Sequence, residues 1–169
     1  EKTDEVLKNG YFHTGDIGHI DSDGFLKITD RKKEMFKTSG GKYIAPQVIE
    51  NAMKQSVLID QIIVVGEGKK FPAALIQPNF EAVEAWAKKE GVTLPKPSEW
   101  NANEQIRTKI FDEVRILNER FGQWEKIKEI RITPDVWSVE EGHLTPTMKL
   151  KRKSIKAKYQ DLFNSIYNS

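Results

Sequence analysis

The stretch Asp60-Gln61-Ile62-Ile63-Val64-Val65-Gly66-Glu67-Gly68-Lys69-Lys70-Phe71-Pro72-Ala73-Ala74-Leu75-Ile76-Gln77 decides how the chain folds. Its two apolar runs, 60–65 and 73–77, are separated by a glycine-rich segment, which predicts two strands joined by a loop. The loop lacks the spacing and the Lys-Ser/Thr ending of a phosphate-binding loop. We therefore interpret it as an exposed hairpin connection.

Helices and further strands alternate along the rest of this half of the chain. Pro46 suits the first turn of a helix, and Asn79 can cap another. Apolar residues at steps of four, four, three and four predict a longer core helix that Gly122 closes. The expected helices are 46–55, 80–90, 106–121 and 154–168, and a further strand is expected from Ile127 to Pro134.

A separate hairpin is predicted near the amino end. Asp16 to Ile20 and Phe25 to Thr29 alternate apolar and polar residues around the turn Asp21-Ser22-Asp23-Gly24. A calcium loop would need a glutamate where Asp30 stands, so a turn is favoured over a metal site. The pattern favours an α/β or α+β module, and we expect the α+β class: a small mixed sheet flanked by helices, preceded by this β-hairpin. The domain boundary is expected at 30–33, which gives domains 1–30 and 31–169.

Composition excludes several classes of protein. The 169 residues are 31% charged and 38% hydrophobic, with a net charge of +2 and no cysteine, so disulfides, thiolate zinc sites and cysteine nucleophiles are ruled out. No apolar run approaches the roughly 18 residues of a membrane-spanning helix. The three histidines lack ligand spacing, and no metal site is predicted. Because the chain begins with Glu1, we expect a fragment of a longer protein.

The segment from Lys149 to Lys158 is strongly basic, with lysine or arginine at six of its ten positions. Lys151, Arg152 and Lys153 precede or begin the helix that Ser154 is expected to open. Cations at a helix amino terminus are locally unfavourable, so the cluster predicts an anionic partner. A solvated basic tail is the open alternative.

Four motifs stand in order along the chain: Gly10-Tyr11-Phe12-His13-Thr14-Gly15-Asp16, Gly24-Phe25-Leu26-Lys27-Ile28-Thr29-Asp30-Arg31-Lys32-Lys33, Lys37-Thr38-Ser39-Gly40-Gly41-Lys42-Tyr43-Ile44-Ala45-Pro46 and the segment around Lys149. They resemble the motifs of the adenylate-forming superfamily, in the variant typical of long-chain fatty acid CoA ligases. A fifth stretch, Phe121-Gly122-Gln123-Trp124-Glu125, shares the resemblance, which spans most of the chain. It implies an AMP-forming acid-thiol ligase, of which residues 1–30 would end the large N-terminal adenylation domain and 31–169 would form the C-terminal lid.

The resemblance implies nucleotide-binding and hinge roles for three residues. Asp16 resembles the aspartate that accepts hydrogen bonds from both ribose hydroxyls of ATP, with a turn aspartate as the alternative. Arg31 resembles an arginine that also reaches the ribose, with a salt bridge to Asp30 as the alternative. Lys33 matches the hinge about which the lid rotates between two catalytic arrangements.

Lys149 resembles the adenylation lysine, although Thr147-Met148 replaces the usual Ser-Gly before it. A fixed ammonium would neutralise the charge that gathers when a fatty carboxylate attacks the α-phosphate. Lys37, Gly40 and Gly41 match the face used for thioester formation, where glycine leaves room for pantetheine. A solvated strand lysine and plain turn glycines are the alternatives.

The implied ligands are ATP, CoA, a fatty acid and Mg²⁺, the last with no recognisable ligand in this chain. The implied partner is the missing N-terminal domain of the same polypeptide, without which the chain would be inert; no nucleic acid is expected. The parent enzyme would be cytoplasmic, with peripheral membrane association left open. The alternative is a free-standing module that binds nucleic acid or anionic lipid through the basic segment.

Overall fold

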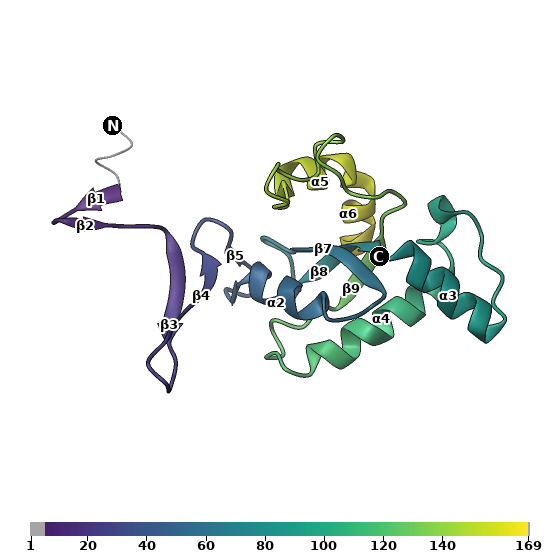
Figure 1. The fold of residues 1–169 in the computed structure, drawn as a ribbon, viewed down its shortest axis with the longest axis horizontal. Coiled ribbons are helices and arrows are strands. Elements are labelled where there is room, and N and C mark those ends of the chain that lie inside the picture. Colours follow the sequence, from purple (N-terminus) through teal and green to yellow (C-terminus); the bar gives the residue numbers. More distant parts are fainter. Residues whose placement is uncertain (1–5, 169) are drawn as a thin grey trace.

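The computed structural model describes residues 6–168, except for the side chains of residues 29–31. Figure 1 shows two parts, an extended arm of short strands and a body in which helices cover both faces of a sheet. This arrangement is the expected α+β fold, with a small mixed sheet flanked by helices and preceded by a hairpin.

The central sheet is built from the stretch that the sequence singled out. Strands β7 (Ile59–Val65) and β8 (Ala73–Pro78) pair in antiparallel fashion, and β9 (Glu129–Ile132) lies parallel to β8, so the order is β7-β8-β9. The predicted strand pair is therefore confirmed. Because successive side chains of a strand point to opposite faces, the apolar runs supply two cores at once.

One core lies beneath helices α2 (Pro46–Met53), α3 (Phe80–Glu90) and α4 (Glu104–Asn118). Its sheet side includes Ile62, Val64, Ala74 and Ile76. The predicted cap of α3 is present, since Ala82 N donates to Asn79 Oδ1 at 3.1 Å. A short 3-10 helix, Pro97–Glu99, connects α3 with α4.

Helix α4 ends at Asn118, so the prediction that it runs on to Gly122 was wrong. The Asn118 side chain leaves the helix to bond both backbone groups of Ile127: Asn118 Nδ2 donates to Ile127 O at 2.9 Å, and Ile127 N donates to Asn118 Oδ1 at 3.1 Å. This tertiary pairing ends the helix one turn before the glycine.

The opposite face of the sheet carries two helices where the sequence predicted one. The single helix expected from Ser154 to Asn168 is instead α5 (Arg152–Lys158) and α6 (Gln160–Tyr167). They are broken at Tyr159, which has φ −106° and ψ 33°. The break lets the buried Tyr159 ring pack near Trp137 and donate its hydroxyl to Asp135. The apolar residues beneath these helices include Ile63, Val65, Leu75, Ile155 and Phe163.

The arm contains β1 (Leu7–Lys8), β2 (Tyr11–Phe12), β3 (Asp16–Ile20) and β4 (Leu26–Arg31). Strands β3 and β4 form the predicted hairpin, and its turn is held by Asp21 Oδ1, which accepts from the backbone N–H groups of Asp23 and Phe25. Two further short strands, β5 (Phe36–Lys37) and β6 (Tyr43–Ile44), lead into α2.

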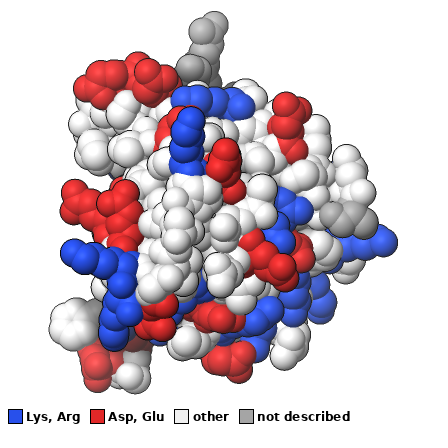
Figure 2. Space-filling model, turned by 90° about the vertical axis from the view of Figure 1, so that its right-hand side faces the viewer, with Lys and Arg blue, Asp and Glu red and all other residues white. Residues whose placement is uncertain are grey.

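The distribution of surface charge and the length of the helices complete the description of the fold. On the face drawn in Figure 2, cationic and anionic side chains are interspersed, so that face presents no patch of a single sign. Among residues 6–168, no helix combines the length and the apolar character needed to cross a membrane.

Candidate functional site

Lys149 sits on a tight hairpin that its own sequence explains. Thr145 N donates to Lys149 O at 2.8 Å, and Lys149 N donates to Thr145 Oγ1 at 3.0 Å, which closes a turn over Pro146 and Thr147. An antiparallel bridge between Leu144 and Leu150 closes the base of the hairpin. Lys149 is therefore held by backbone and hydroxyl bonds on both of its backbone polar groups.

A cleft of about 320 Å³ lies between this hairpin, the arm and helix α2. Lys149 lines one side, and Asp16 of β3 and Ile28 of β4 line the other. Residues 133 positions apart thus share one cavity. Strand pairing also sets Asp16 directly opposite Arg31 in register, although the Arg31 side chain and its suggested bridge to Asp30 lie outside the described residues.

The floor of the cleft is an ion-pair cluster that the sequence did not reveal. Arg152 donates through Nη1 to Glu50 Oε1 at 2.8 Å and through Nη2 to Glu50 Oε2 at 2.5 Å, and its Nε donates to Glu34 Oε2 at 3.2 Å. Glu50 is only 4% exposed. Arg152 therefore already has anionic partners within the chain. The prediction that Ser154 opens the helix was wrong, because α5 begins at Arg152.

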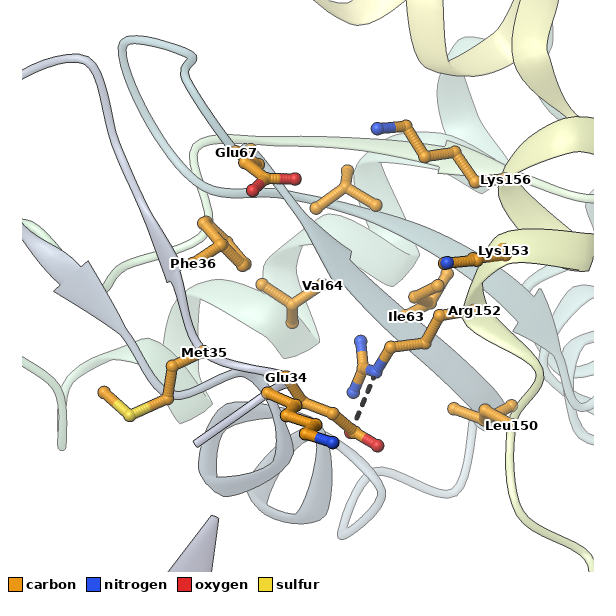
Figure 3. A pocket seen from close by; sticks show the side chains of 13 residues that line it. Glu34, Met35, Phe36, Ile63, Val64, Glu67, Leu150, Arg152, Lys153 and Lys156 are labelled. Carbon is orange, nitrogen blue, oxygen red and sulfur yellow. Dashed lines mark hydrogen bonds and ion pairs between the residues drawn. The ribbon is translucent and has the colours of Figure 1, made fainter. Parts of the chain in front are cut away.

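The same cluster separates two cavities. On its other side lies a second cleft of about 510 Å³, which Lys33 and Phe36 line on one side and α5 on the other. Figure 3 looks into this cleft: the Glu34–Arg152 ion pair is dashed, and Lys153 and Lys156 project from α5 across from Glu67. Lys33, the expected hinge residue, directly precedes Glu34, which accepts a hydrogen bond from Arg152.

The charges of the cluster favour its ionised form. Burial raises the pKa of Glu50, but Arg152 and the Val64 N–H, which donates at 2.7 Å, oppose that rise. Burial alone would lower the pKa of Arg152; the carboxylates of Glu50 and Glu34 outweigh it and raise that pKa. Three N–H groups converge on the two oxygens of Glu50, which is the pattern of an ionised carboxylate because only that form accepts without donating.

The residues expected to serve thioester formation lie elsewhere. Lys37, Gly40 and Gly41 line neither cleft and belong to the β5–β6 turn, where Thr38 N donates to Lys42 O at 2.9 Å. Gly41 has φ +80°, a left-handed conformation that favours glycine. The exposed Lys37 ammonium lies 5.5 Å from the centre of the Tyr43 ring.

A backbone connection anchors that turn to the central sheet. Gly68 N donates to Lys37 O and Ser39 N donates to Lys69 O, both at 2.9 Å. The glycine-rich loop between β7 and β8 is therefore a support for the β5–β6 turn as well as a hairpin connection. Ser39 also contributes to a separate hollow of about 410 Å³ beside Lys69 and Tyr167.

The described residues contain no group of three or more histidine, aspartate or glutamate side chains that could hold a metal ion. The acidic turn Asp21–Gly24 is satisfied by its own backbone and by Lys27, whose Nζ lies 3.1 Å from Asp21 Oδ2. Within the part of the chain that the structure describes, these side chains do not fit a magnesium site.

Sequence reasoning missed Glu34, Glu50 and Arg152 as a cluster. One signal was available: Glu50 stands between the apolar Ile49 and Ala52 at the edge of the helix stripe, where a charge needs a buried partner. Its partner is 102 residues away, and no local spacing points to Arg152.

These features coincide with a known protein class. Residues 34–169 match the model of the family described as "AMP-binding enzyme C-terminal domain", and the chain belongs to this family, the C-terminal domain of adenylate-forming enzymes. It is 38% identical to the long-chain-fatty-acid–CoA ligase FadD15 of Mycobacterium tuberculosis over 99% of this chain and 28% of that protein. It is 37% identical to the human long-chain-fatty-acid–CoA ligase 1 over 99% of this chain and 24% of that protein. The chain thus spans about a quarter of these curated relatives.

Solved structures share the fold. The adenylation domain of a carboxylate reductase from Mycobacterium chelonae superimposes with a TM-score of 0.81 at 24% identity, over 99% of this chain and 25% of that one. A fatty acyl CoA synthetase of Mycobacterium tuberculosis gives 0.55 at 23% identity, over 96% of this chain and 27% of that one.

Proposed function

We propose that this chain is the C-terminal lid portion of an ATP-dependent long-chain fatty acid CoA ligase, together with the last hairpin of its large N-terminal domain. The observation that carries the proposal is the cleft that Asp16 and Lys149 both line. Relatives that share more than a third of its residues and carry the name of that ligase support it. Residues 1–30 and 31–169 are the two domain segments we propose.

In the first half-reaction the fatty carboxylate attacks the α-phosphate of ATP and pyrophosphate leaves. Both reactants are anions, so the Lys149 ammonium would lower the barrier by neutralising charge that concentrates in the transition state. Asp16 would orient the nucleotide by accepting from both ribose hydroxyls, with Arg31 assisting. Magnesium would be held by the triphosphate and by residues other than those described here.

In the second half-reaction the CoA thiol attacks the acyl carbonyl and AMP leaves. Rotation about Lys33 would withdraw Lys149 and bring the β5–β6 turn to the site. There Gly40 and Gly41 would leave room for pantetheine, and Lys37 would face the same path. The location of these residues outside the Lys149 cleft fits a two-face lid.

The test separates the two half-reactions in the full-length enzyme. Lys149→Ala should slow acyl-adenylate formation roughly 100- to 1000-fold, by analogy with the loss of one oxyanion-hole donor. Thioester formation from preformed acyl-adenylate should stay near the wild-type rate. Lys151→Ala, which removes an exposed lysine outside both clefts, is the matched control and should leave both steps unchanged. Equal slowing of both steps by Lys149→Ala would contradict the proposal.

A free-standing anion-binding module is the competing function, and the geometry weakens it. Arg152 forms ion pairs with Glu34 and Glu50, and Lys158 Nζ lies 3.4 Å from Asp135 Oδ2. That function requires steeply salt-dependent binding of oligonucleotides or anionic vesicles by this chain alone. We propose a cytoplasmic location for the parent enzyme, with peripheral membrane association as the alternative. A fluorescence titration with anionic vesicles at two salt concentrations tests the anion-binding function and the membrane association.

A further inference from the structure

Arg152 makes a two-pronged contact for which the proposed function gives no role. Its guanidinium donates one N–H to each oxygen of Glu50, at 2.8 and 2.5 Å. The Arg152 side chain is 22% exposed and that of Glu50 is 5% exposed, so little water competes for the pair. A paired arrangement of this kind fixes direction as well as distance, because both planar groups must align.

The third donor of the same guanidinium reaches a different part of the chain. Arg152 Nε donates to Glu34 Oε2, which also accepts from Gln47 Nε2 at 2.6 Å. Glu34 directly follows Lys33, so one side chain ties the start of α5 to helix α2 and to the segment beside the proposed hinge. Each of the three guanidinium nitrogens therefore donates to a carboxylate.

The position of Arg152 in the chain couples this fork to Lys149. Lys151 N donates to His143 O at 2.8 Å, and Leu150 bridges Leu144, so the residues between Lys149 and Arg152 are bonded to the other limb of the hairpin. Leu150 and Arg152 line both clefts. A change in where Arg152 is held must therefore change where the hairpin carries Lys149.

We propose that Arg152 is a positioning residue for the adenylation step: its fork on Glu50, with its bond to Glu34, holds the hairpin so that Lys149 lines the cleft shared with Asp16. This inference rests on the proposed function of Lys149. Lysine at position 152 would keep the charge but could not make the paired contact, since an ammonium is a point charge rather than a planar fork.

The test is Arg152→Lys in the full-length enzyme, with Arg115→Lys as the matched control. Arg115 forms an exposed pair with Asp112 on α4, so its replacement should change nothing. Arg152→Lys should slow acyl-adenylate formation roughly 10- to 100-fold, by analogy with the loss of groups that orient metal ligands. It should act on kcat more than on the KM for ATP, and it should spare thioester formation from preformed acyl-adenylate.

A double-mutant cycle decides whether Arg152 acts through Lys149. In a Lys149→Ala background, Arg152→Lys should cause no further loss of adenylation, because the residue that it positions is already gone. Multiplicative losses would overturn the inference and leave the proposed function intact. Normal adenylation in Lys149→Ala alone would overturn both.

A second variant protects the test against misfolding. If Arg152→Lys unfolds, Glu34→Gln removes only the charge of the less buried partner and should still give a selective loss of adenylation at an unchanged melting temperature. Equal loss of both half-reactions in Glu34→Gln, in step with a lower melting temperature, would show a merely structural cluster and overturn the inference.

Discussion

At the scale of single residues, Met148 adopts a backbone conformation that favours glycine. The resemblance places Ser-Gly where this chain has Thr147-Met148, and Met148 has φ +61°. This left-handed conformation favours glycine, and for other residues it costs about 1–2 kcal/mol. The bond from Met148 N to Thr145 O at 2.8 Å holds the strained turn that presents Lys149.

We therefore expect Met148→Gly and Met148→Val to differ. Glycine relieves the left-handed strain but makes the unfolded chain more flexible, and the two effects offset within about 1 kcal/mol. Valine, branched at Cβ, fits this conformation poorly and should lower both the melting temperature and the rate of adenylation. Thermal unfolding and pyrophosphate release of the two variants check the prediction, and equal behaviour would contradict it.

At the scale of elements, the sequence predicts what repeats locally and misses what is paired at a distance. The apolar runs of β7 and β8, the Asn79 cap and the β3–β4 hairpin all follow from neighbours within a few residues. The end of α4 does not, because the Asn118 side chain bonds the backbone of Ile127, which precedes β9. The break at Tyr159 does not either, because it depends on Trp137 and Asp135.

The same division applies to the candidate site. Motif resemblance brought Asp16 and Lys149 forward, and the structure sets both on one cleft. The Glu50–Arg152 pair stayed hidden because its members are 102 residues apart and each looks ordinary in its own helix.

The bond pair made by Asn118 gives an element-scale prediction. Asn118→Ala leaves the buried N–H and C=O groups of Ile127 without their partner, and each such group costs about 1–3 kcal/mol. We expect a loss of roughly 2–4 kcal/mol in the free energy of unfolding, measured with urea. Asn164→Ala, on the exposed face of α6, is the control and should change the midpoint little. Equal midpoints for the two variants would contradict this account.

His143, at the base of the Lys149 hairpin, predicts that the stability of the fold depends on pH. Burial lowers the pKa of His143, and Lys158 lowers it further against the opposing effects of Glu141 and Asp135. The unfolded chain then binds the proton more readily than the folded one, so stability is full above the ordinary histidine pKa of about 6.5 and falls as the pH drops below it.

Urea unfolding between pH 7.5 and 5.5 should show this fall, and His143→Gln should remove most of it while the carboxylates remain ionised. Since His143 O accepts from Lys151 N, the same loss should loosen the hairpin first. If the free energy of unfolding changed equally with pH in the two proteins, the pH dependence would belong to other groups.

At the scale of the whole molecule, the arm is held differently from the body. Strands β3 and β4 pair with each other, β4 contacts α2, and large apolar side chains of the arm remain on the surface. Exposed apolar residues gathered on one part of the chain indicate a surface that binds a partner. Those of the arm are Leu7, Tyr11, Phe12, Ile20, Phe25, Leu26 and Ile28, each more than half exposed.

We propose that the N-terminal domain of the full-length enzyme covers this surface, and hydrogen exchange tests the proposal. In the 169-residue chain, amides of β3 and β4 should exchange much faster than those of β7 to β9, because an exposed hairpin opens locally at little cost whereas a strand between two apolar cores does not. In the full-length enzyme the hairpin amides should become slower while β7 to β9 stay unchanged. A dilution series excludes protection by a second copy, which would weaken as the concentration falls. Hairpin protection that is already complete in the dilute chain would mean that the arm is stable alone and that its apolar surface needs no covering domain.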